Sequence, residues 1–147
     1  MIVENCADAK THNTITAFIN LVEADMDDGV IDFKLLHEQR YMPFWKHLCI
    51  TKLTDDGKDL EVVLWGTDLV THTGLELTGK RLGAQSFRKA YDVLKRKKLD
   101  AIEHKQLSYT SGGIALEEKN ETVRWYNACV PMTQNDRASC LAIVCFG

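Results

Sequence analysis

The stretch LEVVLWGTDLVTHTGLELTGKRL, residues 60–82, decides the fold that we expect for this chain. It begins as a short apolar run rich in valine, leucine and tryptophan, and the turn residues DDG at 55–57 mark this run as a β-strand. Gly66 ends the strand, and Gly74 and Gly79 then interrupt the chain at close intervals. Because glycine permits the backbone conformations of tight turns, this spacing predicts short helices joined by turns.

Two longer helices are predicted before and after this stretch. Residues 11–28 carry apolar side chains at helical spacing, which form one stripe of an amphipathic helix. Such a helix must bury its stripe, either on the sheet of its own domain or against a second copy of the chain. Residues 85–103 form the second helix, and we expect its basic cluster KRKK, residues 95–98, to be a solvated face because the chain as a whole is acidic.

Five strands are predicted in two groups. Residues 46–54 and 60–67 form a hairpin before the long helix, and three further strands follow that helix, at 105–110, 122–132 and 138–146. Hairpin connections within each group predict an α+β fold with one five-stranded antiparallel sheet and its helices on one face.

Two local features interrupt this pattern. Between the first helix and the first strand, Asp32 is expected to cap a short helix that Pro43 ends. Ser111-Gly112-Gly113 predicts a bulge or bend in or after the third strand.

The bulk composition restricts the function. The 147 residues carry a mild net charge of −3, which gives no case for nucleic-acid binding, since a protein that binds nucleic acid is expected to have a strongly basic face. No apolar run reaches the roughly 18 residues that span a bilayer, and the N-terminus lacks a secretory signal. We therefore expect a cytoplasmic protein that binds neither nucleic acid nor membrane. The five cysteines lack metal-site spacing and are expected to be buried free thiols.

Several motifs occur in the order typical of one family. Trp65-Gly66-Thr67 ends a strand, residues 74–80 (GLELTGK) form a turn after it, and residues 126–132 form a strand that begins with tyrosine and runs into a proline. In these features residues 30–146 resemble the PAS domain, most closely a small bacterial branch of single-domain PAS proteins. The resemblance implies a PAS-like domain at 30–147, preceded by an N-terminal flanking helix at 1–29 of a kind that often dimerises.

The resemblance implies sensing or signalling rather than catalysis. The serines, histidines and acids are not spaced as a nucleophile, base and orienting group, and His37-Glu38 lacks the second histidine of a zinc-protease helix. We therefore expect no enzyme activity and no metal site. Because almost the whole chain belongs to the domain, we expect a stand-alone module whose output passes to a separate signalling protein.

No cofactor is assigned by the sequence. A flavin-cysteinyl adduct needs a reactive cysteine within residues 84–94, where there is none, and a photoactive-yellow chromophore needs one between Cys49 and Cys129. Haem-binding PAS domains use a histidine on the long helix, but His104 lies at its end and His72 lies in the broken turns. We therefore expect neither a flavin adduct nor haem.

Two functional hypotheses remain open. In the first, the module acts by association, with a homodimer formed through the first helix and a small ligand as an option; the interface candidates are Ile15, Phe18, Ile19 and Val22. In the second, the chain is a small-molecule receptor for an apolar or haem-type ligand, and binding is the primary event. PAS domains hold ligands between sheet and helices, and composition does not separate a filled core from a hollow one. The candidates for lining such a pocket are Trp65, Phe87, Tyr91, Leu94, Tyr109 and Trp125.

Overall fold

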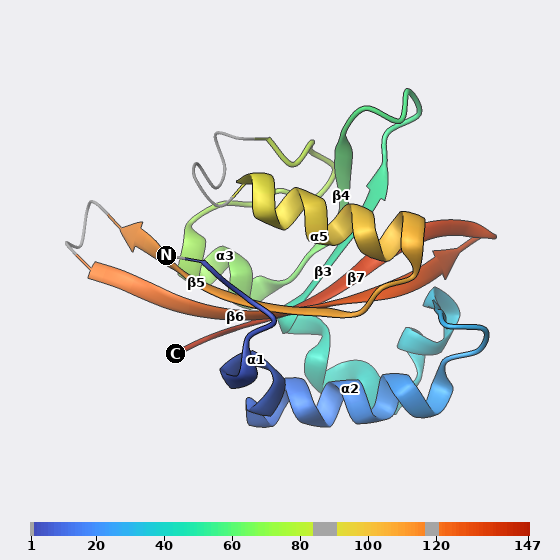
Figure 1. Cartoon of the computed structure of the whole chain (residues 1–147), viewed down its shortest axis with the longest axis horizontal. Helices are drawn as coiled ribbons and strands as arrows, with labels where there is room; N and C mark the ends of the chain where they lie inside the picture. The colour runs from blue at the N-terminus through green and yellow to red at the C-terminus, as the bar shows by residue number, and fades with distance from the viewer. Residues whose placement is uncertain (1, 84–90, 117–120) are drawn as a thin grey trace.

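The computed structural model describes residues 2–83, 91–116 and 121–147. These residues form an α+β fold in which helices cover both faces of one open, mainly antiparallel sheet (Figure 1). The sequence correctly predicted the α+β class and the single sheet, but it was wrong to place the helices on one face. None of the described helices is both long and apolar enough to span a membrane.

The sheet has seven strands in the described residues, of which five are long and two are short. The order is β1-β5-β6-β7-β3-β4, and β2 pairs in parallel with β6 outside this path. The five long strands are those that the sequence predicted, whereas β1 and β2 have two residues each and are too short to show a period. The strands are β1 Val3–Glu4, β2 Ile31–Asp32, β3 Leu48–Leu53, β4 Leu60–Trp65, β5 Ser108–Leu116, β6 Glu121–Gln134 and β7 Arg137–Phe146.

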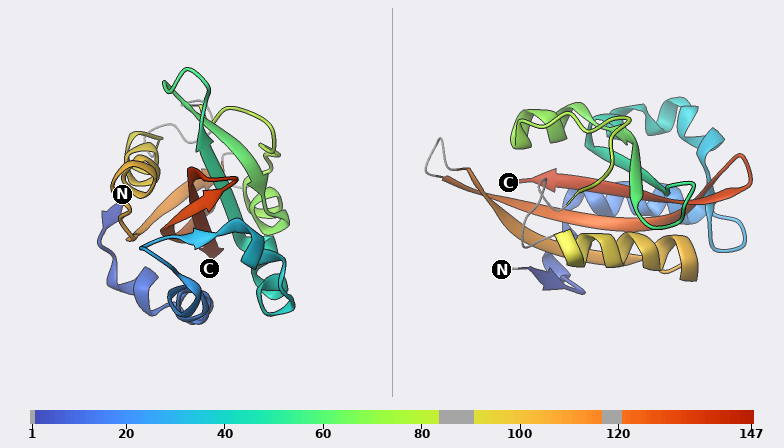
Figure 2. Two further views of the ribbon diagram at one scale, coloured as in Figure 1. Left: turned by 90° about the vertical axis from the view of Figure 1, so that its right-hand side faces the viewer. Right: turned by 90° about the horizontal axis from the view of Figure 1, so that it is seen from above.

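The helices form two layers on opposite sides of the sheet (Figure 2). One layer contains α1, α2 and two 3-10 helices, and the other contains α3 and α5. Their bounds are α1 Ala7–Thr11, α2 Asn13–Asp25, η1 Phe33–His37, η2 Gln39–His47, α3 Thr67–Thr73 and α5 Tyr91–His104.

The apolar stripe of α2 packs on the sheet of its own chain. Its four members are buried, with 0–5% of each residue exposed, against side chains such as Leu48 and Ile143. In this fold the stripe is therefore unavailable to a second copy, and the predicted dimer interface through these residues is wrong. The physical reason is that both sheet faces are apolar and each needs a cover. The residues concerned are Ile15, Phe18, Ile19 and Val22.

Polar contacts fix the end of α2 against η2. The Tyr41 hydroxyl donates to the Asp25 carboxylate, and Arg40 lies 2.7 Å from the same carboxylate. Asp32 caps η1 as predicted, because its side chain accepts from the Lys34 backbone N–H at 2.9 Å. Pro43 was expected to end a helix, but it lies inside η2. The chain here is wound in short 3-10 turns, in which the missing N–H removes a single hydrogen bond.

Residues 60–82 fold as predicted, as a strand followed by a short helix and turns. Gly74 ends α3 in the left-handed conformation, with φ of 73°, and its N–H donates to the Val70 carbonyl at 2.8 Å. After the turn at Gly79 the chain runs back along β4, where Leu82 donates to the Leu60 carbonyl at 2.8 Å. This return segment covers the open edge of β4 and places Leu82 in the core beneath α5.

Candidate functional site

A cavity of about 40 Å³ lies between the sheet and the layer of α3 and α5. Since a buried water needs at least about 10–15 Å³ of such space, the cavity has room for a few water-sized groups. Pockets for drug-sized ligands are about 300–1,000 Å³, so the site suits only a small ligand. The described lining residues are Cys49, Trp65, Leu69, Thr73, Leu82, Leu94, Lys98, Trp125, Asn127, Val144 and Phe146.

Three of the six predicted pocket residues line this cavity, namely Trp65, Leu94 and Trp125. Tyr91 packs against the same apolar cluster without lining the cavity, and its hydroxyl lies 3.4 Å from an Asp59 carboxylate oxygen. Phe87 falls outside the described residues.

Tyr109 was assigned to the wrong face of the sheet. In the register of β5 with β6 it lies opposite Ala128, which faces α2, and Tyr109 packs in that cluster. Trp125 faces α5, and Ala128 lies an odd number of residues away on the same strand. Because side chains on a strand alternate between faces, the two cannot share one face. A pairing register was needed to decide this.

Gly112 makes room for Trp125. A Cβ at Gly112 would lie 2.5 Å from Cζ2 of the Trp125 ring, a distance that real atoms do not occupy. The register of β5 with β6 continues without a break from Ser108 to Leu116, so the predicted bulge is absent from this strand. The glycine instead permits the close approach of the Trp125 ring, which lines the cavity.

Trp65 is held at the corner between strand and helix. Its indole N–H donates to the Leu75 carbonyl at 2.8 Å, directly after the turn at Gly74. At Gly66, a Cβ would lie 2.3 Å from the Lys46 carbonyl oxygen, so only glycine lets η2 pass this close. Gly66 and Gly74 therefore help to position Trp65, which forms part of the cavity wall.

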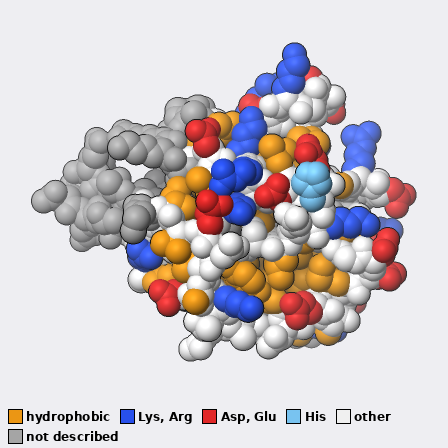
Figure 3. Space-filling view, in the orientation of Figure 1, with side chains coloured by type: hydrophobic (Ala, Val, Ile, Leu, Met, Phe, Trp, Pro, Cys, Tyr) orange, Lys and Arg blue, Asp and Glu red, His pale blue; other side chains and the backbone are white. Residues whose placement is uncertain are grey.

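Lys98 is the site residue that the sequence did not identify. We expected it on a solvated basic face, but it is only 5% exposed and lines the cavity. Its neighbours on α5 point to β1 instead: Arg96 and Lys97 both pair with Glu4. Charges of both signs lie over this helix (Figure 3). Within the described part of the chain, Lys98 Nζ makes no hydrogen bond and no ion pair with a carboxylate.

Three cysteines lie beneath Lys98 on adjacent strands. Cys49 on β3 and Cys129 on β6 are both paired with Ala142 of β7, and Cys140 lies further along β7. All five cysteines of the chain are buried and free, which confirms the prediction. Asn127, which lines the cavity, donates from Nδ2 to Cys129 Sγ at 3.4 Å. Asn127 thus links the lining of the cavity to the cysteines that lie near the Lys98 ammonium.

The cluster has strongly shifted proton affinities. A hydrogen bond from Cys140 and the charge of Lys98 outweigh burial and lower the pKa of Cys129 to about 6. Burial alone lowers the pKa of Lys98, but negative charge on the cysteines outweighs burial and raises it. The hydrogen bond to Cys129 raises the pKa of Cys140, and burial raises that of Cys49. These shifts favour a charged Lys98 ammonium and the ionised form of the Cys129 thiol near it.

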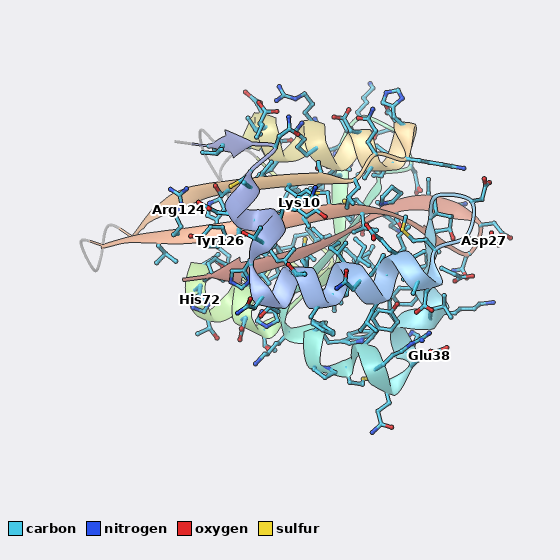
Figure 4. All side chains as sticks on the ribbon, turned by 60° about the horizontal axis from the view of Figure 1, so that its bottom comes forward. Lys10, Asp27, Glu38, His72, Arg124 and Tyr126 are labelled. Carbon is cyan, nitrogen blue, oxygen red and sulfur yellow. The ribbon has the colours of Figure 1, made fainter. Side chains whose placement is uncertain are left out.

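The two histidines considered for haem are not among the cavity-lining residues. His104 is exposed at the end of α5. His72, labelled in Figure 4, lies on α3 and stacks on Phe146 with ring centroids 4.3 Å apart. Among the described residues no group of histidines, cysteines and acids is arranged to hold a metal ion. The chemistry of the cavity is therefore that of an amine, thiols and an amide.

Comparison with known proteins gives no match. No protein-family model matches this chain, and no curated protein does.

Proposed function

We propose that this chain is a PAS-like sensory module, not an enzyme, that binds a small ligand between the sheet and α5. Its output passes by association to a separate signalling protein. The observation that carries the proposal is the buried, cavity-lining Lys98, which has no carboxylate partner in the described part of the chain. The resemblance to PAS domains supports it, because that family holds ligands in the corresponding place.

Stability alone does not account for Lys98. Moving an ammonium out of water is unfavourable by several kcal/mol, and an apolar side chain of similar volume at such a position is often neutral or stabilising. By contrast, ligand pockets are mostly apolar with a few polar groups that orient the ligand. The cavity walls of tryptophan, leucine, valine and phenylalanine around one cation have this composition.

A change at Lys98 has a direct route to the N-terminal segment. On the same helix, Lys97 Nζ lies 3.1 Å from the Glu4 carboxylate, and Arg96 pairs with the same group. Glu4 belongs to β1, the edge strand that precedes α1 and α2. A ligand that moves α5 would therefore move β1. We expect the separate signalling protein to associate at this edge of the sheet and to respond to that movement.

Thermal unfolding with a panel of small acids, amides and alcohols tests the proposal. A ligand that binds only the folded state raises the melting temperature by mass action. The Val144→Ile variant, which adds a methylene to the cavity wall, should lose this shift. The matched control Val63→Ile lies against the cluster on the opposite face and should keep it. Native mass spectrometry of freshly purified protein would show a retained ligand. The absence of any shift and of any added mass would contradict the proposal.

A further inference from the structure

We propose that the cavity beside Lys98 binds a small organic monoanion, a short-chain carboxylate, with the Lys98 ammonium as its counter-ion. The inference rests on the proposed function and deepens it by naming the ligand class. It follows from the charge, the polar inventory and the size of the cavity.

The described side chains that line the cavity carry charge of one sign. Lys98 is the single charged side chain among the described lining residues, and its environment otherwise consists of apolar walls and thiols. A buried charge is stable when it is paired and hydrogen-bonded. An anionic ligand supplies a partner on the cavity side of the ammonium, whereas a cation would be repelled by it.

The polar inventory favours one negative charge over several. Thr73 Oγ1 donates to the Leu69 carbonyl, and Asn127 Nδ2 donates to Thr110 Oγ1 at 3.1 Å and to Cys129. The donors of Thr73 and Asn127 are therefore already engaged. Phosphates and dicarboxylates need several charge-assisted donors, and the described cavity offers one ammonium.

The size and walls of the cavity define the rest of the ligand. A space of about 40 Å³ admits only a few heavy atoms. The rings of Trp65, Trp125 and Phe146 leave an apolar surface for a short alkyl group. Acetate and propionate have this combination of one carboxylate and a small apolar tail.

The thiol cluster competes with the ligand for Lys98. The groups that face the ammonium are Cys49 from β3, Cys129 from β6 and Cys140 from β7. α3 contributes the uncharged Thr73 to the cavity. When the carboxylate takes over the ammonium, the Cys129 thiolate loses its partner and takes up a proton. Binding therefore strengthens as the pH falls through the pKa of Cys129, where the thiol is neutral and no longer competes. It weakens as the pH rises, provided the ligand remains ionised.

Tryptophan fluorescence and calorimetry test the ionic contact directly, because two tryptophans line the cavity. The probes are propionate and the neutral propionamide of similar shape, at constant ionic strength. A hydrogen bond to a charged group corresponds to roughly tenfold or more in affinity. We expect propionate to bind at least about tenfold more tightly than propionamide, with proton uptake visible as a buffer-dependent heat.

Two variants on α5 separate the contact from general effects of charge. Lys98→Met should lose at least about tenfold in propionate affinity, whereas Lys95→Met, whose ammonium lies on an exposed part of α5 and 3.4 Å from the Lys58 carbonyl oxygen, should keep the wild-type affinity. Because methionine suits a buried site, Lys98→Met is expected to fold.

Three outcomes would overturn the inference. Unchanged propionate affinity in Lys98→Met would show that Lys98 is not the counter-ion of the ligand. Equal affinity for propionate and propionamide would show that the site does not select an anion, while the proposed ligand site itself would stand. No binding of either probe, together with no added mass in native mass spectrometry, would contradict both the inference and the proposed function.

Discussion

The two faces of the sheet are built differently. The face beneath α2 is filled by fully buried apolar side chains such as Phe18, Leu36 and Ile50. The face beneath α5 contains apolar residues too, but it also contains a cavity, a buried lysine and three thiols. Both faces are equally able to build a core, so the polar groups on one of them require another explanation. We call the face beneath α2 the structural face, and the face beneath α5, where we propose that the ligand binds, the functional face.

Phe18→Ala on the structural face should give the largest loss of stability. Phe18 is fully buried and its ring lies 5.3 Å from that of Phe44 and 6.1 Å from that of Tyr41, centroid to centroid. Truncation leaves a cavity, and we expect a loss of about 3–5 kcal/mol in the free energy of unfolding. Leu94→Ala, which borders an existing cavity, should lose clearly less. Urea denaturation measures both, and equal losses would remove the contrast between the faces.

Gly112→Ala should give the next largest effect. The new Cβ would meet Trp125 at 2.5 Å, so the indole must shift toward the cavity. Overpacking of this kind costs about 1–3 kcal/mol, and the tryptophan emission should change. In a Trp125→Phe background the smaller ring leaves room, so the same glycine substitution should cost less. A penalty that is the same in both backgrounds would show that Trp125 is not the cause.

Lys98→Met should leave stability unchanged or raise it by about 1 kcal/mol, because an apolar isostere replaces a buried charge. This result would sharpen the contrast, since a buried lysine that held the fold together by an ion pair would leave a buried charge unpaired when replaced, and the protein would be destabilised. The control Lys95→Met removes an exposed contact with the Lys58 carbonyl and should change stability by no more than about 1 kcal/mol. Chemical denaturation decides the point. A large loss of stability in Lys98→Met would show that the lysine is a structural residue.

The smallest expected effect is spectroscopic. The wild-type protein should show the ultraviolet absorbance of one thiolate that appears as the pH rises through about 6. Lys98→Met should move this transition toward the ordinary thiol value of 9.0. Since the folded-state pKa lies below the unfolded one, the wild type should gain stability as the pH rises between these values and lose it as the pH falls. Cys129→Ala identifies the signal by removing it, and a thiolate signal that persists in this variant would belong to another residue.

The sequence predicted the architecture because hydrophobic period and turn residues determine it locally. Gly66, Gly74 and Gly79 correctly placed the corner between strand and short helix. The sequence left open whether α2 lies on its own sheet or on a second copy, because a stripe of apolar residues shows that a face is buried but not what buries it. The face of Tyr109 likewise depends on strand register, which composition does not contain.

Lys98 shows where the sequence argument stopped. It lies in a run of four basic residues, and such a run usually indicates a solvated face. The spacing of Leu94, Lys98, Ala101 and Ile102 did contain a signal, because these positions recur at i, i+4, i+7 and i+8 on one side of a helix. Lys98 lies on this apolar stripe, and that position predicts a buried side chain. A charged residue on the apolar stripe of a helix therefore indicates a site better than the charged residues beside it in the sequence do.

Heteronuclear NMR of the Lys98 ammonium, recorded with and without propionate, tests the central claim most directly. We expect a charged ammonium at neutral pH whose signal shifts on addition of propionate, with accompanying shifts at Asn127 and the Trp125 indole. The residues beneath α2 should not respond. A neutral amine, or a propionate response that is absent or centred on the α2 face, would contradict the assignment of function to the α5 face.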